Sequence, residues 1–209
     1  MDRQEFFDRQ ARDWDATGPH DLGPRLARVI GKAKLLPKQR VLDVGTGTGV
    51  LIPLILEAVG PSGGIVTLDS SSEMLGAARG KGFPNNVAFV RADMQHAPML
   101  DDARFDRVIC NATFPHFADR RKALAEMARV LRPGGLLIIS HPIGRAAVNA
   151  LHRQQGEIVA QDRVPAPAEM RRLLAQAGLE GIRIIDEPEF YLAAARRRKV
   201  LQIRTVIAR

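Results

Sequence analysis

Three glycines at alternate positions, directly after a short apolar strand, constrain this chain more than any other feature. Residues 40–50 read RVLDVGTGTGV, so the glycines are Gly45, Gly47 and Gly49. Glycine has no Cβ, and it therefore adopts the positive φ values of a tight strand-to-helix turn and lets backbone amides approach a ligand. The helix expected next points its free N–H groups and the positive end of its dipole at this turn. The segment predicts a binding site for a polar, anionic group.

Two common phosphate-binding patterns do not fit the turn. A dinucleotide-binding turn has glycines at its first, third and sixth positions, but the sixth position counted from Gly45 is Val50. A Walker loop ends in Gly-Lys-Ser or Gly-Lys-Thr, but no lysine lies between Arg40 and Glu57. The pattern that remains is Asp-x-Gly-x-Gly-x-Gly, which begins at Asp43.

The next apolar strand, at residues 64–69, also ends in a carboxylate. Asp69 follows the glycines by about twenty residues, where nucleotide-binding folds place the acidic residue that binds ribose hydroxyls. Ser70 and Glu73 have the spacing of a capping box, which predicts that a helix begins here. The two strands and their polar ends therefore predict one ligand site shared between them.

Two later strands and a helix extend the pattern. The strand at 87–91 leads to Asp93, the strand at 105–111 ends in Asn111, and residues 126–140 read EMARVLRPGGLLIIS. In this order the motifs resemble class I S-adenosylmethionine-dependent methyltransferases. The helix, Pro-Gly-Gly turn and strand resemble their type 11 (ubiquinone/menaquinone C-methyltransferase-like) branch. The resemblance covers residues 40–140.

The resemblance implies an α/β fold, with a Rossmann-like seven-stranded, mostly parallel sheet, helices on both faces and a C-terminal antiparallel hairpin. The alternation of predicted strands and helices independently favours parallel strands with right-handed crossovers. We expect a single domain overall. Its parts are an N-terminal helical lid at 1–36, the S-adenosylmethionine-dependent methyltransferase domain at 37–196, and a basic C-terminal tail or last strand at 197–209.

The same resemblance implies S-adenosyl-L-methionine as the cofactor and S-adenosyl-L-homocysteine as the product. Asp69 is expected at the ribose and Asp93 at the adenine amino group, with Met74 and Met94 against the adenine or in the core. The expected cofactor-binding residues are Asp43, Gly45, Thr46, Gly47, Gly49, Asp69, Ser70, Met74, Asp93, Met94 and Asn111.

Residues 2–15 predict an amphipathic helix, because their apolar side chains recur at helical spacing. Phe6, Phe7, Ala11 and Trp14 share one side. The end of this segment resembles the Ala-x-x-Trp-Asp stretch that precedes the first motif in the family, where the helix covers the cofactor cleft. Trp14 then either contacts the ligands or anchors the helix on the core, and both roles stay open.

Histidines supply the candidate catalytic groups. His116 follows the strand at 105–111 and His141 follows the strand at 136–140, so both are expected at the acceptor side of the cleft as general base or substrate contact. The further candidate substrate contacts are Trp14, Phe114, His152 and Tyr191. Converging imidazoles are also able to hold a divalent metal, but no metal is expected.

Composition limits the class of protein. The 209 residues suit one domain, and 31 Lys and Arg against 23 Asp and Glu leave a net charge of +8. Such a charge suits nucleic acid or an acidic small substrate. The single cysteine, Cys110, excludes an internal disulfide and fits a reducing cytoplasm. No stretch reaches the roughly 20 apolar residues that cross a bilayer, so we expect a cytoplasmic protein without a membrane span.

The favoured interpretation is a methyltransferase that acts on a small molecule by in-line displacement, with the acceptor and the oligomeric state left open. One alternative is an RNA or protein amino-group methyltransferase. Residues 111–114, Asn-Ala-Thr-Phe, share the ends of the Asn-Pro-Pro-Tyr/Phe motif of amino-methylating enzymes but lack both prolines. Another alternative is a protein that binds the cofactor without catalysis. Nucleic acid is the less favoured partner.

Overall fold

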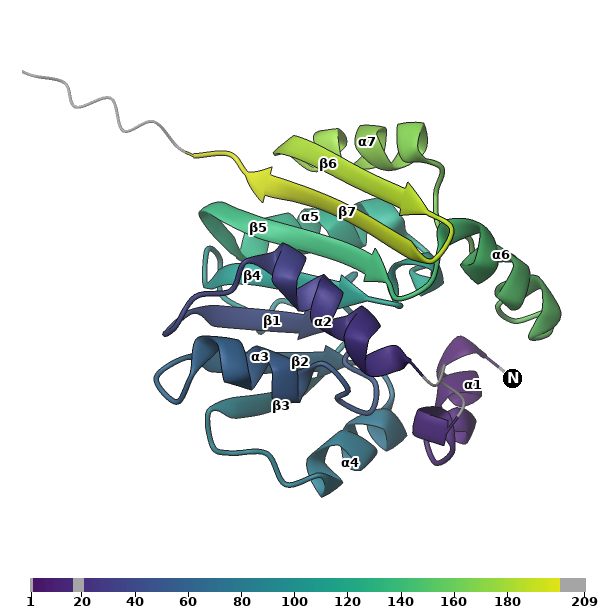
Figure 1. Ribbon diagram of the computed structural model, residues 1–209, viewed down its shortest axis with the longest axis horizontal. Coiled ribbons are helices and arrows are strands. Elements are labelled where there is room, and N and C mark those ends of the chain that lie inside the picture. Colours follow the sequence, from purple (N-terminus) through teal and green to yellow (C-terminus); the bar gives the residue numbers. More distant parts are fainter. Residues whose placement is uncertain (1, 17–20, 200–209) are drawn as a thin grey trace, which may run out of the picture.

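The computed structural model describes residues 2–16 and 21–199. Within these ranges the chain forms a seven-stranded sheet in the order β3-β2-β1-β4-β5-β7-β6 (Figure 1). The strands are β1 (Arg40–Val44), β2 (Gly64–Asp69), β3 (Val87–Arg91), β4 (Phe105–Asn111), β5 (Leu131–His141), β6 (Leu179–Glu187) and β7 (Phe190–Arg197). The first five strands pair in parallel, and β7 pairs antiparallel with both β5 and β6. The predicted sheet and its C-terminal hairpin are confirmed.

Helices connect the strands and cover both faces of the sheet. They are α1 (Arg3–Gln10), α2 (Leu22–Ala33), α3 (Ile52–Val59), α4 (Ser72–Gly80), α5 (Arg120–Val130), α6 (Arg145–Gln154) and α7 (Pro167–Gln176), with short 3-10 helices η1 (Trp14–Ala16) and η2 (Phe114–His116). Helices α2 and α3 pack on one face, and α5 and α7 pack on the other (Figure 1). None of the helices in the described ranges is long and apolar enough to span a membrane.

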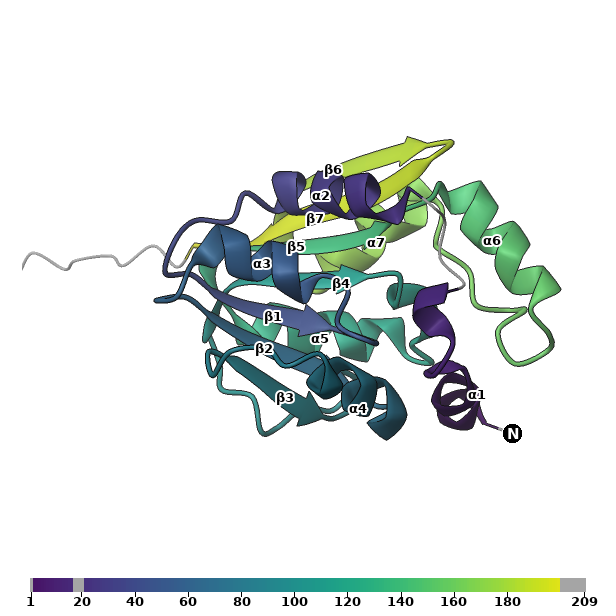
Figure 2. The same ribbon diagram turned by 60° about the horizontal axis from the view of Figure 1, so that its bottom comes forward.

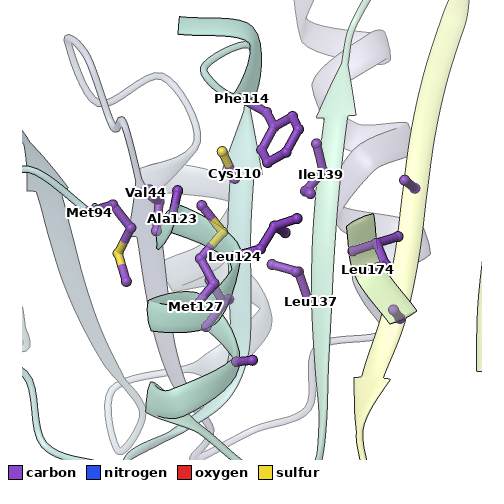
Figure 3. Packing of buried hydrophobic residues seen from close by; sticks show 14 of the residues in the cluster. Val44, Met94, Cys110, Phe114, Ala123, Leu124, Met127, Leu137, Ile139 and Leu174 are labelled. Atoms are coloured by element: carbon purple, nitrogen blue, oxygen red, sulfur yellow. The ribbon is translucent and has the colours of Figure 1, made fainter. Parts of the chain in front are cut away.

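A hydrophobic core fills each side of the sheet. On the α5 side, Leu124 and Met127 pack against Leu137 and Ile139 of β5 (Figure 3). This core also contains Cys110, whose thiol is fully buried in β4. Burial of this kind accounts for the nearly continuous apolar runs of the central strands, because helices cover both of their faces.

The strand order reverses between β1 and β4, and this reversal places the functional site. β1 pairs with β2 on one side and with β4 on the other. In open parallel sheets a crevice forms at such a reversal, beyond the carboxyl ends of the strands. The glycine turn after β1, Asp69 at the end of β2 and Asn111 at the end of β4 all lie at this edge.

The structure corrects two details of the sequence prediction and leaves a third outside the described residues. The N-terminal helix ends at Gln10, and a turn and η1 follow, because Asp15 bonds to the body of the domain instead of continuing the helix. Helix α4 is capped by the Ser71 side chain, which accepts from Met74 N–H, so the capping box expected at Ser70 was wrong. Residues 200–209, most of the predicted tail, lie outside the described residues.

Candidate functional site

A cavity of about 320 Å³ opens at the carboxyl ends of β1, β2 and β4. This volume lies at the lower end of the range of about 300–1,000 Å³ that is usual for small-ligand pockets. The predicted cofactor residues line it, with the exception of Gly49. The lining members of that set are Asp43, Gly45, Thr46, Gly47, Asp69, Ser70, Met74, Asp93, Met94 and Asn111.

The glycine turn forms one wall of the cavity and depends on the absence of side chains. Gly45 and Gly47 have φ values of +66° and +55°, which residues with a Cβ rarely adopt. A Cβ on Gly45 would overlap the Thr113 side chain. Gly49 serves a different purpose, because a Cβ there would press on Ile52 of α3. Gly49 therefore allows close packing behind the turn rather than contact with a ligand.

Asp69 joins the end of β2 to the glycine turn. Its carboxylate accepts hydrogen bonds from the backbone N–H of Gly47 at 2.8 Å and of Ser71 at 3.0 Å. Burial raises the pKa of Asp69, and these backbone hydrogen bonds oppose the rise. An ionised carboxylate has about four acceptor sites, so Asp69 retains capacity for the hydroxyl groups of a ligand.

Asp43 is a second carboxylate that is buried at the cavity wall. It is 2% exposed, and the Thr46 hydroxyl donates a hydrogen bond to it at 2.6 Å. Burial raises its pKa to about 6, and the nearby charge of Asp69 adds to the rise. No cationic side chain among residues 2–16 and 21–199 forms an ion pair with Asp43. A buried carboxylate in this state favours a positively charged ligand.

The far wall of the cavity is built by the polar ends of β3 and β4. Asp93 accepts a hydrogen bond from the backbone N–H of Gln95 at 2.9 Å. The side-chain amide of Gln95 lies 3.0 Å from one carboxylate oxygen of Asp93 and 2.8 Å from the other. Asn111 accepts from the Ser140 hydroxyl at 3.0 Å. Gln95 also lines the cavity, and the sequence analysis did not select it because nothing in its local pattern marks it.

The N-terminal segment covers the mouth of the cavity. Helix α1 lies beyond the carboxyl ends of the strands (Figure 2), and Arg3, Gln4 and Phe7 of α1 line the cavity together with Trp14. Two hydrogen bonds hold this segment on the rest of the domain. Asp8 accepts from the Ser71 hydroxyl, and Asp15 accepts from the Thr48 hydroxyl. The segment thus bonds directly to the glycine turn and to the start of α4.

Of the predicted acceptor-side residues, His116 and Trp14 line the cavity, whereas four others do not. His141, His152 and Tyr191 are buried outside the lining. Phe114 is fully buried in the core, beside Cys110 and Ile139 (Figure 3). His141 Nε2 and the Tyr191 hydroxyl are buried, and no residue that the structure describes forms a hydrogen bond with either atom. Burial, with charge repulsion from the other two histidines, lowers the pKa of His141 to about 3.

His116 instead belongs to a polar cluster at the cavity edge. Its Nδ1 lies 2.8 Å from the Asp162 carboxylate, which also accepts from Arg3 Nη2 at 2.6 Å and from Arg3 Nε at 3.1 Å. His152 Nδ1 lies 2.5 Å from the Asp162 carbonyl oxygen. The described residues contain no cluster of three or more His, Cys, Asp or Glu side chains suited to a metal ion. Sequence analysis missed Asp162, which is 46 residues from His116.

Comparison with known proteins gives consistent matches. The family model described as "Methyltransferase domain" matches residues 42–139. A ubiquinone/menaquinone biosynthesis C-methyltransferase (UbiE) of Hahella chejuensis is 32% identical over 193 residues, which cover 83% of this chain and 74% of the relative. The protein of the same name from Vibrio parahaemolyticus is 35% identical over 174 residues, but the match spans only 64% of that relative and 77% of this chain.

The fold is also found among solved structures. The crystal structure of an S-adenosylmethionine-dependent methyltransferase from Aquifex aeolicus superposes with a TM-score of 0.73 and 25% sequence identity. This match covers 91% of this chain and 98% of the Aquifex chain. The match therefore extends over nearly the whole of both chains.

Proposed function

This chain belongs to the S-adenosylmethionine-dependent methyltransferase family, and we propose that it methylates a small-molecule acceptor at the cavity beyond β1, β2 and β4. The observation that carries the proposal is the pair Asp43 and Asp69. Asp43 is buried and Asp69 is partly buried beside the glycine turn, and both line the same cavity. Together they fit a ligand that has a positive charge and free hydroxyl groups.

The residues present fit the cofactor. Asp69, with acceptor capacity left, suits the ribose hydroxyls. Asp93, Met74 and Met94 suit the adenine, since they combine a polar acceptor with soft apolar side chains. The ammonium and sulfonium charges match the need of Asp43 for a cation. The carboxylate of the methionine part of the cofactor fits the turn that contains Gly47, because backbone N–H groups before a helix bind anions.

The bound cofactor supplies an activated methyl group. The protein itself must hold the acceptor in line with that group, keep water away and accept a proton where the acceptor loses one. Phe7 and Trp14 are in edge-to-face contact and supply an apolar cover. His116 is the proton acceptor in this proposal, because among residues 2–16 and 21–199 it is the only histidine that lines the cavity.

Two observations support a small acceptor. Residues of α1 line the cavity, and its volume of about 320 Å³ leaves little room beside the cofactor. Three similar relatives are named for methylation in the biosynthesis of ubiquinone and menaquinone, which are small molecules. We therefore place the acceptor of this chain in the class of small organic molecules.

The test is a screen of small-molecule pools for release of S-adenosylhomocysteine by the purified protein. Total RNA and a protein extract are included as competing pools. The proposal predicts turnover with at least one small-molecule pool and none with the macromolecules. Transfer to RNA or protein alone contradicts the small-molecule acceptor, and cofactor binding without transfer to any pool contradicts catalysis.

A further inference from the structure

We infer that Asp162 is a positioning residue for His116. It fixes the His116 ring with the proton on Nδ1, so that Nε2 is the nitrogen offered to the methyl acceptor. Arg3 completes this arrangement when α1 covers the cavity. The inference rests on the proposed function, because it assigns the proton-accepting atom of the same site.

Hydrogen bonding determines which nitrogen carries the proton. Asp162 lies between α6 and α7, is 5% exposed, and places its Oδ2 2.8 Å from His116 Nδ1. A carboxylate only accepts hydrogen bonds, so the nitrogen beside it is the donor. In a neutral imidazole the other nitrogen then has the free lone pair. No group in the described ranges bonds to His116 Nε2, which leaves this atom for a ligand.

Two neighbouring rings fix the orientation of the imidazole. The Phe7 ring meets the His116 ring edge to face, with centroids 4.9 Å apart. The His152 ring is tilted by 45° against the His116 ring, and the two centroids are also 4.9 Å apart. His152 is itself held by the Asp162 carbonyl oxygen at 2.5 Å. One residue therefore anchors both histidines, and rotation of His116 would break contacts with all three neighbours.

The surroundings of His116 favour its neutral form. Burial lowers the pKa of His116 most, and both the hydrogen bond to Asp162 and the negative charge of Asp162 oppose this effect. The charges of His152 and Arg3 lower the pKa further, and His141 at the end of β5 is a third imidazole within electrostatic range. The pKa of His116 therefore lies below its ordinary value. At neutral pH the ring is uncharged, and it accepts a proton rather than donating one.

The proton transfer balances without any further reactant. As the acceptor atom attacks the methyl carbon, its bond to hydrogen breaks and the proton moves to His116 Nε2. The new bond joins the acceptor atom to carbon, and the electron pair of the broken carbon–sulfur bond stays on sulfur. The ring becomes positively charged, and the Asp162 carboxylate stabilises that charge at 2.8 Å from Nδ1. Water removes the proton after the product leaves.

Arg3 links this arrangement to the position of α1. Its guanidinium binds both oxygens of Asp162, at 2.6 and 3.1 Å, and it belongs to the helix that covers the cavity. If α1 moves away, Asp162 loses this positive partner and its full charge acts on His116. The pKa of the His116 ring then rises, because the charge of Arg3 no longer lowers it. The covered cavity therefore favours the neutral form of His116 that accepts a proton.

The test is an NMR titration of the histidine rings in the full chain, by long-range ¹H–¹⁵N spectra of labelled histidine. The His116 signal is assigned by its absence from His116→Gln. In the parent protein we expect a proton on Nδ1 and a His116 pKa below the ordinary value of about 6.5. Asp162→Ala removes the acceptor and its negative charge, so we expect mixed tautomers and a lower pKa. Arg3→Gln removes a positive charge, so we expect a higher pKa.

Two matched controls separate these effects from general damage. Asp186→Ala removes a partly buried carboxylate that is paired with Arg145 at 2.7 Å, outside the cavity lining. Arg9→Gln removes an exposed cation from the same helix as Arg3. Both controls are expected to leave the tautomer and the pKa of His116 unchanged.

A parent spectrum with the proton on Nε2 would overturn the inference, as would Asp162→Ala and Arg3→Gln variants that titrate like the parent. If Asp162→Ala does not fold, the parent tautomer and the Arg3→Gln shift decide the question. Calorimetry with S-adenosylmethionine on the same parent sample keeps the two proposals apart. Normal cofactor binding without the predicted His116 behaviour contradicts only the role of Asp162, whereas the predicted behaviour without cofactor binding contradicts only the proposed function.

Discussion

Asp69 at the end of β2 accepts a hydrogen bond from the backbone N–H of Gly47 at 2.8 Å, and so holds the glycine turn that follows β1. The ribose-binding role expected from the sequence considers only the ligand. In the folded chain the same carboxylate also shapes the turn, because it bonds to Gly47 on one oxygen and to Ser71 on the other. Removal of the Asp69 side chain should therefore weaken both the glycine turn and the binding of the ligand.

Asp69→Ala is expected to weaken cofactor binding by about 1–3 kcal/mol, the usual cost of losing a charged hydrogen-bond partner. It should also lower the melting temperature of the cofactor-free protein, because two backbone N–H groups lose their acceptor. Calorimetry and thermal unfolding measure the two effects. Glu57→Ala, an exposed carboxylate on α3, is the matched control. Parent-like cofactor affinity in Asp69→Ala would remove Asp69 from the ligand site.

Gly45→Ala is expected to destabilise the protein more than Gly178→Ala. Both glycines have positive φ, +66° and +75°, which costs a residue with a Cβ about 1–2 kcal/mol. A Cβ at Gly178 meets nothing within 4 Å, whereas a Cβ at Gly45 overlaps Thr113. Overpacking adds about 1–3 kcal/mol. Urea unfolding of the two variants measures the difference, and equal losses would show that the close approach to Thr113 has no energetic effect.

Asp43 should make stability depend on pH. Its folded pKa of about 6 lies above the ordinary 3.8, so between these values the folded protein binds more protons than the unfolded chain. The free energy of unfolding therefore falls as pH rises through this window. Asp43→Asn removes this titration, and its stability relative to the parent should increase by about 2 kcal/mol from pH 4 to pH 7, since one pKa unit is about 1.4 kcal/mol.

Urea unfolding of the parent and of Asp43→Asn at the two pH values provides this measurement. Asp101→Asn, at an exposed site, is the control in which the difference should stay constant. A constant difference for Asp43→Asn as well would mean that the Asp43 carboxyl is not desolvated.

Trp14 is the only tryptophan of the chain and lines the cavity, so its fluorescence should report cofactor binding. Binding of S-adenosylmethionine is expected to change the intensity and wavelength of its emission, because the environment of the ring changes. Trp14→Phe should abolish the signal and retain most of the affinity, since an aromatic ring still meets Phe7. Cofactor binding that leaves the Trp14 emission unchanged would contradict the N-terminal segment as a lid.

Much of the fold was predictable because its strands are apolar runs bounded by turn residues. The predicted limits of β2 and β3 agree with the structure at every end residue. The N-terminal helix was less predictable. Its apolar spacing continues to Trp14, but the hydrogen bond between Asp15 and Thr48 directs the chain toward the glycine turn. Tertiary contacts of this kind have no local sequence pattern.

The residues of the candidate site were likewise predictable only in part. Gly45, Asp43 and Asp69 stand at the ends of recognisable strands, and strand direction alone brings them to one edge of the sheet. Asp162 lies in an irregular segment, and only the packing of α1, α6 and η2 brings it to His116 and Arg3. Residue type likewise did not separate His116, which lines the cavity, from His141, which is buried outside it.

The central claim is that one cavity binds S-adenosylmethionine through the glycine turn, Asp43 and Asp69. The most direct measurement is isothermal titration calorimetry of the purified parent protein with S-adenosylmethionine and with S-adenosylhomocysteine. We predict saturable binding of one molecule per chain in the micromolar range. Titrations that release no heat, together with an unchanged melting temperature in the presence of either compound, would contradict the account.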